Sequence, residues 1–243
     1  MVPNSTRYLI IGAGIHGLST AYHLALELKQ RGLGSGHVFG IVAVDGNGGW
    51  YKTVLETDKI QNCKLKIVDR KEEFGKPDHY IHIAIAPPKS HDRAEWFVEK
   101  AVEIGIQEIS FVLTQYSERS NIKMNRLKSR AVSSMKQSLK AYLPQINDML
   151  TISDFVEICS NSEKYVGYLR DDNANFMLKS AKPGNNYCVL IGPEGDFMPE
   201  EIDLAQSCDF QTISLGKNRL RTETAGVAAI SILVSKIEAH SPR

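Results

Sequence analysis

The stretch that decides the fold is YCVLIGPEGDF, residues 187–197. Its apolar run predicts a buried strand, and Gly192, Pro193 and Gly195 end that strand in a loop. A second stretch, QTISLGKNRLRTETAG at residues 211–226, has the same order: a short strand, then a loop that begins at Gly216, then a helix. Ligands of α/β sheets bind at the carboxyl ends of strands. The two loops are therefore the first candidate site.

The surrounding chain alternates between strand and helix patterns. Strands are predicted at residues 80–88, 107–114, 187–192 and 211–216, and helices at residues 90–105, 122–143, 199–208 and 223–238. Ser90 or Asp92 is the expected cap of the first helix, and Pro144 is the expected end of the second. This alternation predicts an α/β fold around a mainly parallel sheet.

Composition limits the classes of protein that fit. The chain has 243 residues, 42% of them hydrophobic, and a net charge of +1. It can form one large domain or two small ones, and no overall field favours nucleic acid. No run is apolar enough to span a membrane, and no histidine cluster suggests a metal site. The cysteines are scattered and predict free thiols in a reducing, cytoplasmic compartment: they are Cys63, Cys159, Cys188 and Cys208.

The N-terminal stretch RYLIIGAGIHG, residues 7–17, carries a dinucleotide-binding pattern at Gly12, Gly14 and Gly17. The acidic residue that would bind the ribose, Asp45, lies further from Gly17 than the usual ~20 residues. No second nucleotide-binding half follows. A flavin- or nicotinamide-linked oxidoreductase is therefore the less favoured interpretation, and an N-terminal segment with a structural role only is the alternative.

Residues 41–56 predict a β-hairpin around the turn DGNGG, and residues 63–70 predict a further strand. The polar connection KEEFGKPDH, residues 71–79, is a plausible domain boundary because it contains both glycine and proline.

Neither candidate loop has the composition of a phosphate site. Both lack a Gly-Lys-Ser/Thr sequence, and Pro193 removes an amide donor where a phosphate would need one. A neutral adenosine suits them better, because glycines let backbone groups approach a flat ligand closely. The alternative is a pair of ordinary tight turns, with Thr222 as a helix cap.

Basic residues without intervening acids mark the segment between Glu118 and Asp148. Apolar residues recur there at helical spacing, and Lys123, Arg126 and Arg130 share a different side of the predicted helix. A face of one sign suggests contact with a nucleic-acid backbone, and a solvated helix face is the alternative. The basic residues are Arg119, Lys123, Arg126, Lys128, Arg130, Lys136 and Lys140.

Several stretches together carry a resemblance to a known family: IAPPKSHDRAEWFVEKAVEIGI, SERS, MKQSLKAYLP, LIGPEGDF and SLGKNRLRTETA. Over about residues 40–238 the chain resembles the ribosomal RNA small subunit methyltransferase E family. These are SPOUT-class enzymes that methylate N3 of a uridine in small-subunit (16S) ribosomal RNA with S-adenosylmethionine. Residues 6–35 resemble instead the first βα unit of FAD-dependent oxidoreductases.

The resemblance implies an α/β domain tied in a trefoil knot, and a homodimer whose cofactor pocket lies near the subunit interface. It implies three domain ranges: an atypical segment over 1–36, an incomplete PUA-like β-barrel over 37–75, and the SPOUT methyltransferase domain over 76–243. Because the barrel lacks its first strands, the competing hypothesis is an RNA-binding protein whose methyltransferase fold is inactive.

The resemblance also implies site residues. For S-adenosylmethionine they are Ile191, Gly192, Pro193, Gly195, Leu215, Gly216, Asn218, Leu220 and Arg221. For RNA they are Arg119, Lys123, Arg126, Arg130 and Gln137. Methylation at N3 needs a base or a group that stabilises the uridine anion. The candidates are Arg119 and Arg221 for the anion, and Glu194 and Glu223 for the proton.

Overall fold

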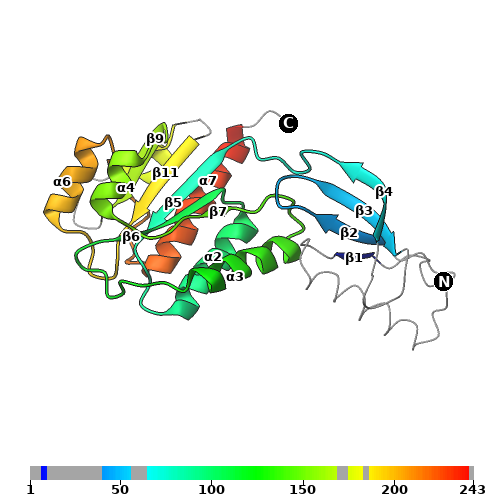
Figure 1. Cartoon of the computed structure of the whole chain (residues 1–243). Helices are drawn as coiled ribbons and strands as arrows, with labels where there is room; N and C mark the ends of the chain where they lie inside the picture. The colour runs from blue at the N-terminus through cyan, green and yellow to red at the C-terminus, as the bar shows by residue number, and fades with distance from the viewer. Residues whose placement is uncertain (1–6, 10–39, 56–64, 169–174, 183–185, 241–243) are drawn as a thin grey trace. The chain divides into compact units, whose positions relative to one another are not determined.

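The computed structural model describes residues 7–9, 40–55, 65–168, 175–182 and 186–240 (Figure 1). The chain divides into two units, of which the first holds residues 1–76 and 135–143 and the second holds residues 77–134 and 144–243. The motif at Gly12, Gly14 and Gly17 lies outside the described residues. Nothing in the local sequence of residues 135–143 predicts that they belong to the first unit.

The first unit contains a four-stranded sheet in the order β1-β2-β3-β4. The predicted hairpin is confirmed: β2 and β3 pair antiparallel, and β4 follows antiparallel to β3. Asp45 Oδ1 accepts hydrogen bonds from the backbone N–H groups of Asn47 and Gly49, at 2.8 and 3.0 Å. The Asp45 carboxylate therefore stabilises the hairpin turn. The oxidoreductase interpretation had assigned it to a ribose instead. The strands are β1 Arg7–Leu9, β2 Gly40–Val44, β3 Trp50–Leu55 and β4 Leu65–Lys71.

The second unit is built on a parallel sheet in the order β10-β12-β9-β11-β5-β6-β7, with β8 pairing β6. All of its strand pairs are parallel, which confirms the predicted fold class. The strands are β5 Tyr80–Ile85, β6 Glu108–Leu113, β7 Gln145–Ile146, β8 Leu150–Thr151, β9 Glu163–Gly167, β10 Asn175–Phe176, β11 Asn186–Ile191 and β12 Gln211–Ser214.

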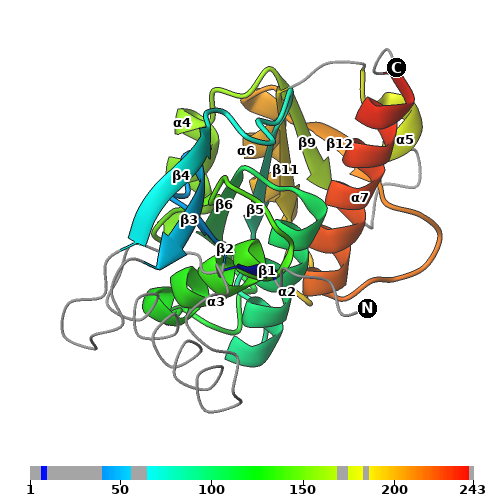
Figure 2. The same ribbon diagram turned by 90° about the vertical axis from the view of Figure 1, so that its right-hand side faces the viewer.

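Helices cover both faces of this sheet, with α2 and α7 on one face and α4 and α6 on the other (Figures 1 and 2). Ser90, one of the two predicted caps, is the N-cap of α2, and its Oγ accepts from the backbone N–H of Arg93 at 3.3 Å. The helices are α2 His91–Ile104, α3 Met124–Gln137, α4 Ile152–Ile158, α5 Met177–Ser180, α6 Pro199–Ser207 and α7 Thr222–His240.

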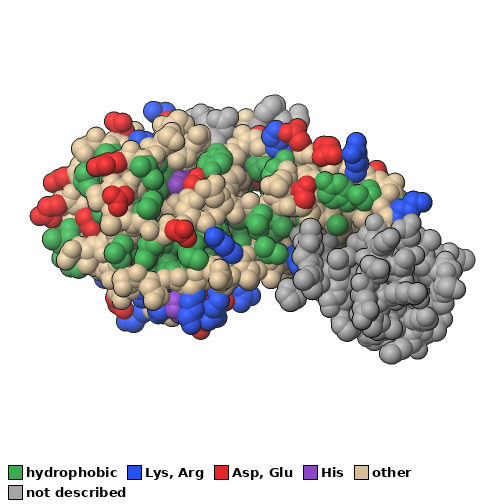
Figure 3. All heavy atoms as spheres, viewed as in Figure 1, with side chains coloured by type: hydrophobic (Ala, Val, Ile, Leu, Met, Phe, Trp, Pro, Cys, Tyr) green, Lys and Arg blue, Asp and Glu red, His purple; other side chains and the backbone are tan. Residues whose placement is uncertain are grey.

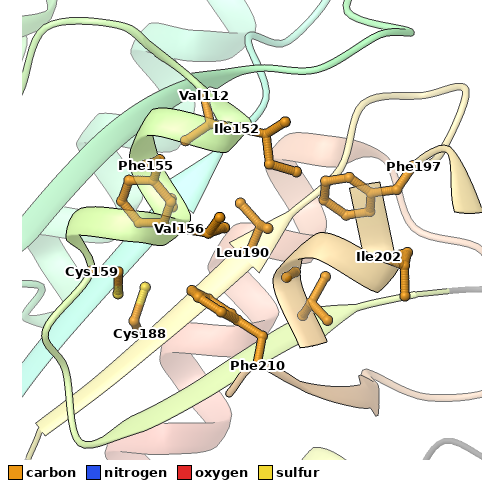
Figure 4. Close-up of a cluster of buried hydrophobic side chains, with 13 residues drawn as sticks. Val112, Ile152, Phe155, Val156, Cys159, Cys188, Leu190, Phe197, Ile202 and Phe210 are labelled. Carbon is orange, nitrogen blue, oxygen red and sulfur yellow. The ribbon is translucent and has the colours of Figure 1, made fainter. Parts of the chain in front are cut away.

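The core lies on both sides of the central strands, so these strands read as continuous apolar runs. On the α4 and α6 side, Cys188 and Leu190 of β11 meet Phe155 of α4, Phe197 and Ile202 (Figure 4). None of the described helices is long and apolar enough to cross a membrane.

The predicted helix over 122–143 is too long, because α3 ends at Gln137. Leu139 has φ of 57°, which an α-helix cannot contain. The backbone N–H of Lys140 donates to the carbonyl of Met135 at 3.1 Å, so the helix closes in a left-handed cap well before Pro144.

Candidate active site

The carboxyl ends of three neighbouring strands, β9, β11 and β12, meet around a pocket of about 180 Å³. Figure 2 shows these strands side by side. Three chain segments supply the lining, one after each strand. The lining residues are Gly167, Tyr168, Ile191, Gly192, Pro193, Asp196, Ile213, Ser214, Leu215, Gly216, Lys217, Asn218, Leu220, Thr222 and Ala225.

Two hydrogen bonds join the loop after β11 to the loop after β12. Thr222 Oγ1 donates to the carbonyl of Gly192 at 3.1 Å, and Arg219 Nη2 donates to the carbonyl of Glu194 at 3.0 Å. Isolated tight turns have no need of such contacts. The two glycine loops therefore form one structure, and the start of α7 is part of it.

Two glycines are required where they stand in this pocket. Gly216 has φ of +133°, a conformation that side chains rarely adopt. A Cβ added at Gly192 would lie 2.8 Å from Cε2 of Phe197, which is fully buried. Both positions keep bare backbone at the pocket wall, where its polar groups can reach a ligand.

Seven of the nine predicted cofactor residues line the pocket: Ile191, Gly192, Pro193, Leu215, Gly216, Asn218 and Leu220. Gly195 and Arg221 lie outside the lining. A Cβ at Gly195 would be 2.9 Å from Cβ of Tyr116. The absence of a side chain at Gly195 therefore lets the loop after β11 pack against the turn that follows β6. The Arg221 side chain is exposed.

Sequence reasoning missed the contribution of β9. Gly167 and Tyr168 line the pocket because β9 lies between β11 and β12, although it precedes both in the chain. The strand EKYVG is short and begins with two charged residues, so its pattern is weak. The other unpredicted lining residues are Asp196, Ile213, Ser214, Lys217, Thr222 and Ala225.

A cluster of charged side chains lies beside the pocket, at the carboxyl ends of β5 and β11. Arg93 bridges two carboxylates: its Nη1 is 3.7 Å from Glu194 Oε1, and its Nε is 3.6 Å from Glu223 Oε1. The backbone N–H of Lys89 also donates to Glu194 Oε1 at 3.3 Å. The cluster thus joins two predicted catalytic residues through Arg93, which sequence reasoning did not single out.

Each of these two carboxylates keeps a second oxygen with no hydrogen-bond partner among the described residues. Glu194 Oε2 and Glu223 Oε2 are both buried. The Glu194 side chain is 26% exposed, whereas that of Glu223 is 7% exposed. A buried acceptor without a donor is costly, so such oxygens mark a place where a ligand can donate a proton or hydrogen bond.

Arg119, the third predicted catalytic residue, approaches the same segment from the turn after β6. Its Nη1 donates to the carbonyl of Lys89 at 3.2 Å, and its Nη2 donates to His91 Nε2 at 2.8 Å. Burial and the neighbouring cations Arg119, Lys123 and Arg126 lower the pKa of His91, so a neutral ring accepts this bond. The guanidinium is therefore held at the edge of the cluster.

The basic helix is only partly free. Arg126 lies 2.5 Å from Glu95, and Arg130 lies 3.2 Å from Glu95 and 3.4 Å from Glu99, so acids of α2 neutralise two of the predicted RNA contacts. Lys123 and Lys128 are exposed, and neither has an ion-pair partner within the described ranges. Gln137 belongs to the first unit.

Charge nevertheless separates over this surface. Figure 3 shows Lys and Arg side chains along the edge where α2 and α3 lie, and Asp and Glu side chains over α4 and α6. In the described part of the chain, no group of three or more His, Cys, Asp or Glu side chains could hold a metal ion.

Comparison with known proteins finds similarity to RNA methyltransferases. The RNA methyltransferase domain family matches residues 76–234. A ribosomal RNA small subunit methyltransferase E from Mesomycoplasma hyopneumoniae is 32% identical over 172 residues, which cover 68% of this chain and 73% of that protein.

Two solved structures have a similar fold. The crystal structure of a probable rRNA-methyltransferase from Porphyromonas gingivalis has a TM-score of 0.80 and 33% identity, and the match covers 88% of this chain and 91% of the other. A ribosomal RNA small subunit methyltransferase E from Neisseria gonorrhoeae, bound to S-adenosyl methionine, has a TM-score of 0.73 and 22% identity, with coverage of 88% and 89%.

Proposed function

Because the chain belongs to the ribosomal RNA small subunit methyltransferase E family, we propose that it methylates N3 of a uridine in small-subunit ribosomal RNA with S-adenosylmethionine. One observation carries the proposal: the two linked glycine loops form a pocket directly beside the cluster of Arg93, Glu194 and Glu223.

The pocket fits the chemistry of S-adenosylmethionine. Leu215, Leu220 and Ile191 offer apolar contact to an adenine ring, and the absence of side chains at Gly192 and Gly216 lets the backbone approach its edge closely. Asp196 and Lys217 supply one charge of each sign, which suits a ligand with both amino and carboxylate groups. When bound, S-adenosylmethionine supplies a methyl group activated by a sulfonium.

The chain's own contribution to the reaction is positioning and proton transfer. Uridine N3 carries a proton that has to leave. We assign its acceptance to Glu194, because this side chain is partly exposed and its buried Oε2 has no hydrogen-bond partner among the described residues to lose when it turns toward a substrate. Glu223 is too buried for that contact and is assigned with Arg93 to positioning Glu194.

Arg119 and Arg221 remain the proposed groups that stabilise the uridine anion. Arg119 is held in place by Lys89 and His91, whereas the exposed Arg221 would have to move toward the substrate. For RNA binding, Lys123 and Lys128 are the strongest candidates, since Arg126 and Arg130 already have acidic partners. A PUA-like role of residues 37–75, the trefoil knot, the homodimer and the cytoplasmic location stay predictions.

The test begins with calorimetric titration of the full chain by S-adenosylmethionine and, separately, by FAD. We expect saturable binding of S-adenosylmethionine alone. Transfer of a labelled methyl group to small ribosomal subunits is then measured for the wild type, for Glu194→Gln and for the matched control Glu200→Gln, which is exposed on α6.

Loss of transfer in E194Q with retained cofactor binding and a normal E200Q supports the assignment. Cofactor and RNA binding without any transfer by the wild type would support the inactive RNA-binding alternative. Binding of FAD instead would overturn the proposal as a whole.

A further inference from the structure

Two cysteine thiols lie side by side in the core beneath α4. Cys159 is the C-cap of α4, directly after Ile158, and Cys188 lies on β11. Both belong to the same buried cluster, with 8% and 0% of their surface exposed, and Figure 4 shows their sulfur atoms turned toward each other. Neither residue lines the pocket at the carboxyl ends of the strands.

The two thiols differ in their readiness to ionise. A hydrogen bond from Cys188, helped by the backbone N–H of Asn161 and the charge of Lys164, lowers the pKa of Cys159 to about 7 against opposing effects of burial and Glu108. Complete burial, and then the bond to Cys159, raise the pKa of Cys188 well above its ordinary value. At neutral pH a sizeable fraction of Cys159 is therefore thiolate, and it faces a protonated Cys188 thiol.

Cys159 also borders a second hollow, of about 390 Å³, at the amino ends of the strands. Its walls combine apolar side chains with a polar patch, in which His82 Nε2 lies 2.8 Å from Ser110 Oγ and Asn147 Nδ2 donates to the same Oγ at 2.8 Å. Such a patch can hold water, and hydrogen peroxide is similar to water in size and in hydrogen bonding. Of the two cysteines, Cys159 borders this hollow, which a small polar oxidant can enter, whereas Cys188 is fully buried and is not among the lining residues.

We propose that Cys159 and Cys188 are an oxidisable dithiol, which reacts with a hydroperoxide and closes to an intramolecular disulfide. The Cys159 thiolate attacks the peroxide, an S–O bond forms, the O–O bond breaks, and the leaving hydroxide takes a proton to become water. The Cys188 sulfur then displaces the oxygen from the Cys159 sulfenic acid as a second water. The peroxide takes up the two electrons that the thiols lose.

The disulfide would join the end of α4 to β11, the strand that leads into Gly192. It would close a loop that contains β9, which also ends at the pocket. Oxidation would therefore restrain two of the three strands from which the pocket loops extend.

The test treats the purified full chain with hydrogen peroxide and maps its peptides by mass spectrometry without reduction. We expect a crosslinked pair of peptides that contain Cys159 and Cys188, loss of both thiols in one chain, and reversal by dithiothreitol. Cys208 is the internal reference, because it is more exposed than either residue.

Two variants sharpen the result. Cys188→Ala should stop the reaction at a Cys159 sulfenic acid that dimedone traps, and Cys208→Ser should leave the crosslink unchanged. The wild-type map needs no variant and so decides the matter even if C188A fails to fold. Retention of both thiols while Cys208 oxidises, or oxidised Cys159 beside a free Cys188, would overturn the proposal.

Discussion

Replacement of Gly226 by alanine tests a close contact between α7 and α2. Gly226 lies in α7, and a Cβ there would be 2.6 Å from Cε2 of Phe97 and 3.2 Å from Cδ1 of Ile85. Both side chains are fully buried, so neither can swing into solvent. The shorter distance is about 0.9 Å less than the ~3.5 Å at which carbon atoms ordinarily meet.

The magnitude follows from two opposing effects. Overpacking of this kind costs ~1–3 kcal/mol, whereas alanine in place of a helical glycine returns up to about 1 kcal/mol. Because neither buried neighbour can swing away, we take the upper part of the overpacking range, about 2–3 kcal/mol, and expect a net loss of ~1–2 kcal/mol in the free energy of unfolding. Because α7 also supplies Thr222 and Ala225 to the pocket, a shift of the helix worth about 1 kcal/mol would raise the Kd for S-adenosylmethionine roughly fivefold.

Urea denaturation followed by circular dichroism measures the first effect, and calorimetric titration measures the second. Phe97→Leu in the same background is the control, because a smaller side chain relieves the collision. The double variant should be less damaged than the sum of the single variants by about 1 kcal/mol. A G226A protein as stable as the wild type, or more stable, would refute the reasoning.

Three further predictions concern the pocket, the charged cluster and the thiol pair. Gly216→Val forces a side chain into φ of +133° and should weaken S-adenosylmethionine binding at least about tenfold, as measured by calorimetry. The control Gly75→Val has φ of +66° outside the pocket and should leave binding unchanged. Equal affinities of the two variants would contradict this prediction. Arg93→Met leaves the buried Glu223 carboxylate without its cation and should cost ~1–3 kcal/mol of stability in urea denaturation, the cost of a buried polar group that has lost its partner. Glu223→Gln should restore part of this loss, and strict additivity of the two changes would argue against the bridge. Alkylation of Cys159 by iodoacetamide requires the thiolate, so its rate should fall about tenfold per pH unit well below pH 7 and level off above it. A rate that still rises nearly tenfold from about pH 7 to about pH 8, as for a free cysteine with a pKa of about 8.5, would contradict the lowered pKa.

Local signals determined how much of the fold was predictable. The run before Gly192 is apolar and ends in glycine and proline, so β11 and its loop could be recognised without any neighbour. The same holds for the hairpin around Asp45. By contrast, β9 begins with two charged residues and is a strand because β11 and β12 pair with both of its edges. Such partners are remote in the chain, and no local pattern announces them.

The candidate site divides in the same way. The two glycine loops could be recognised as a candidate site from their local pattern, and the family resemblance implied seven of the lining residues in and beside them. Arg93 lies in a helix whose sequence gives no sign of the carboxylates that it contacts. The positive charge of α3 could be predicted from the sequence. Its neutralisation by Glu95 could not, because the ion pairs form only when α2 and α3 pack together. The individual helices, strands and loops were therefore easier to predict from the sequence than the contacts between them.

The interleaving of β9 between β11 and β12 also has a consequence for how the protein acquires its pocket. β11 pairs on its other edge with β5, which lies roughly 100 residues earlier in the chain. Long-range pairings of this kind are slow to form, since loop closure precedes the contacts that reward it. A ligand that binds only the completed pocket adds about 2.7 kcal/mol of stability at a concentration of 100 times its Kd. The cofactor would then stabilise only the fully folded protein, because folding intermediates that lack any one of the three strands have no complete pocket to bind it.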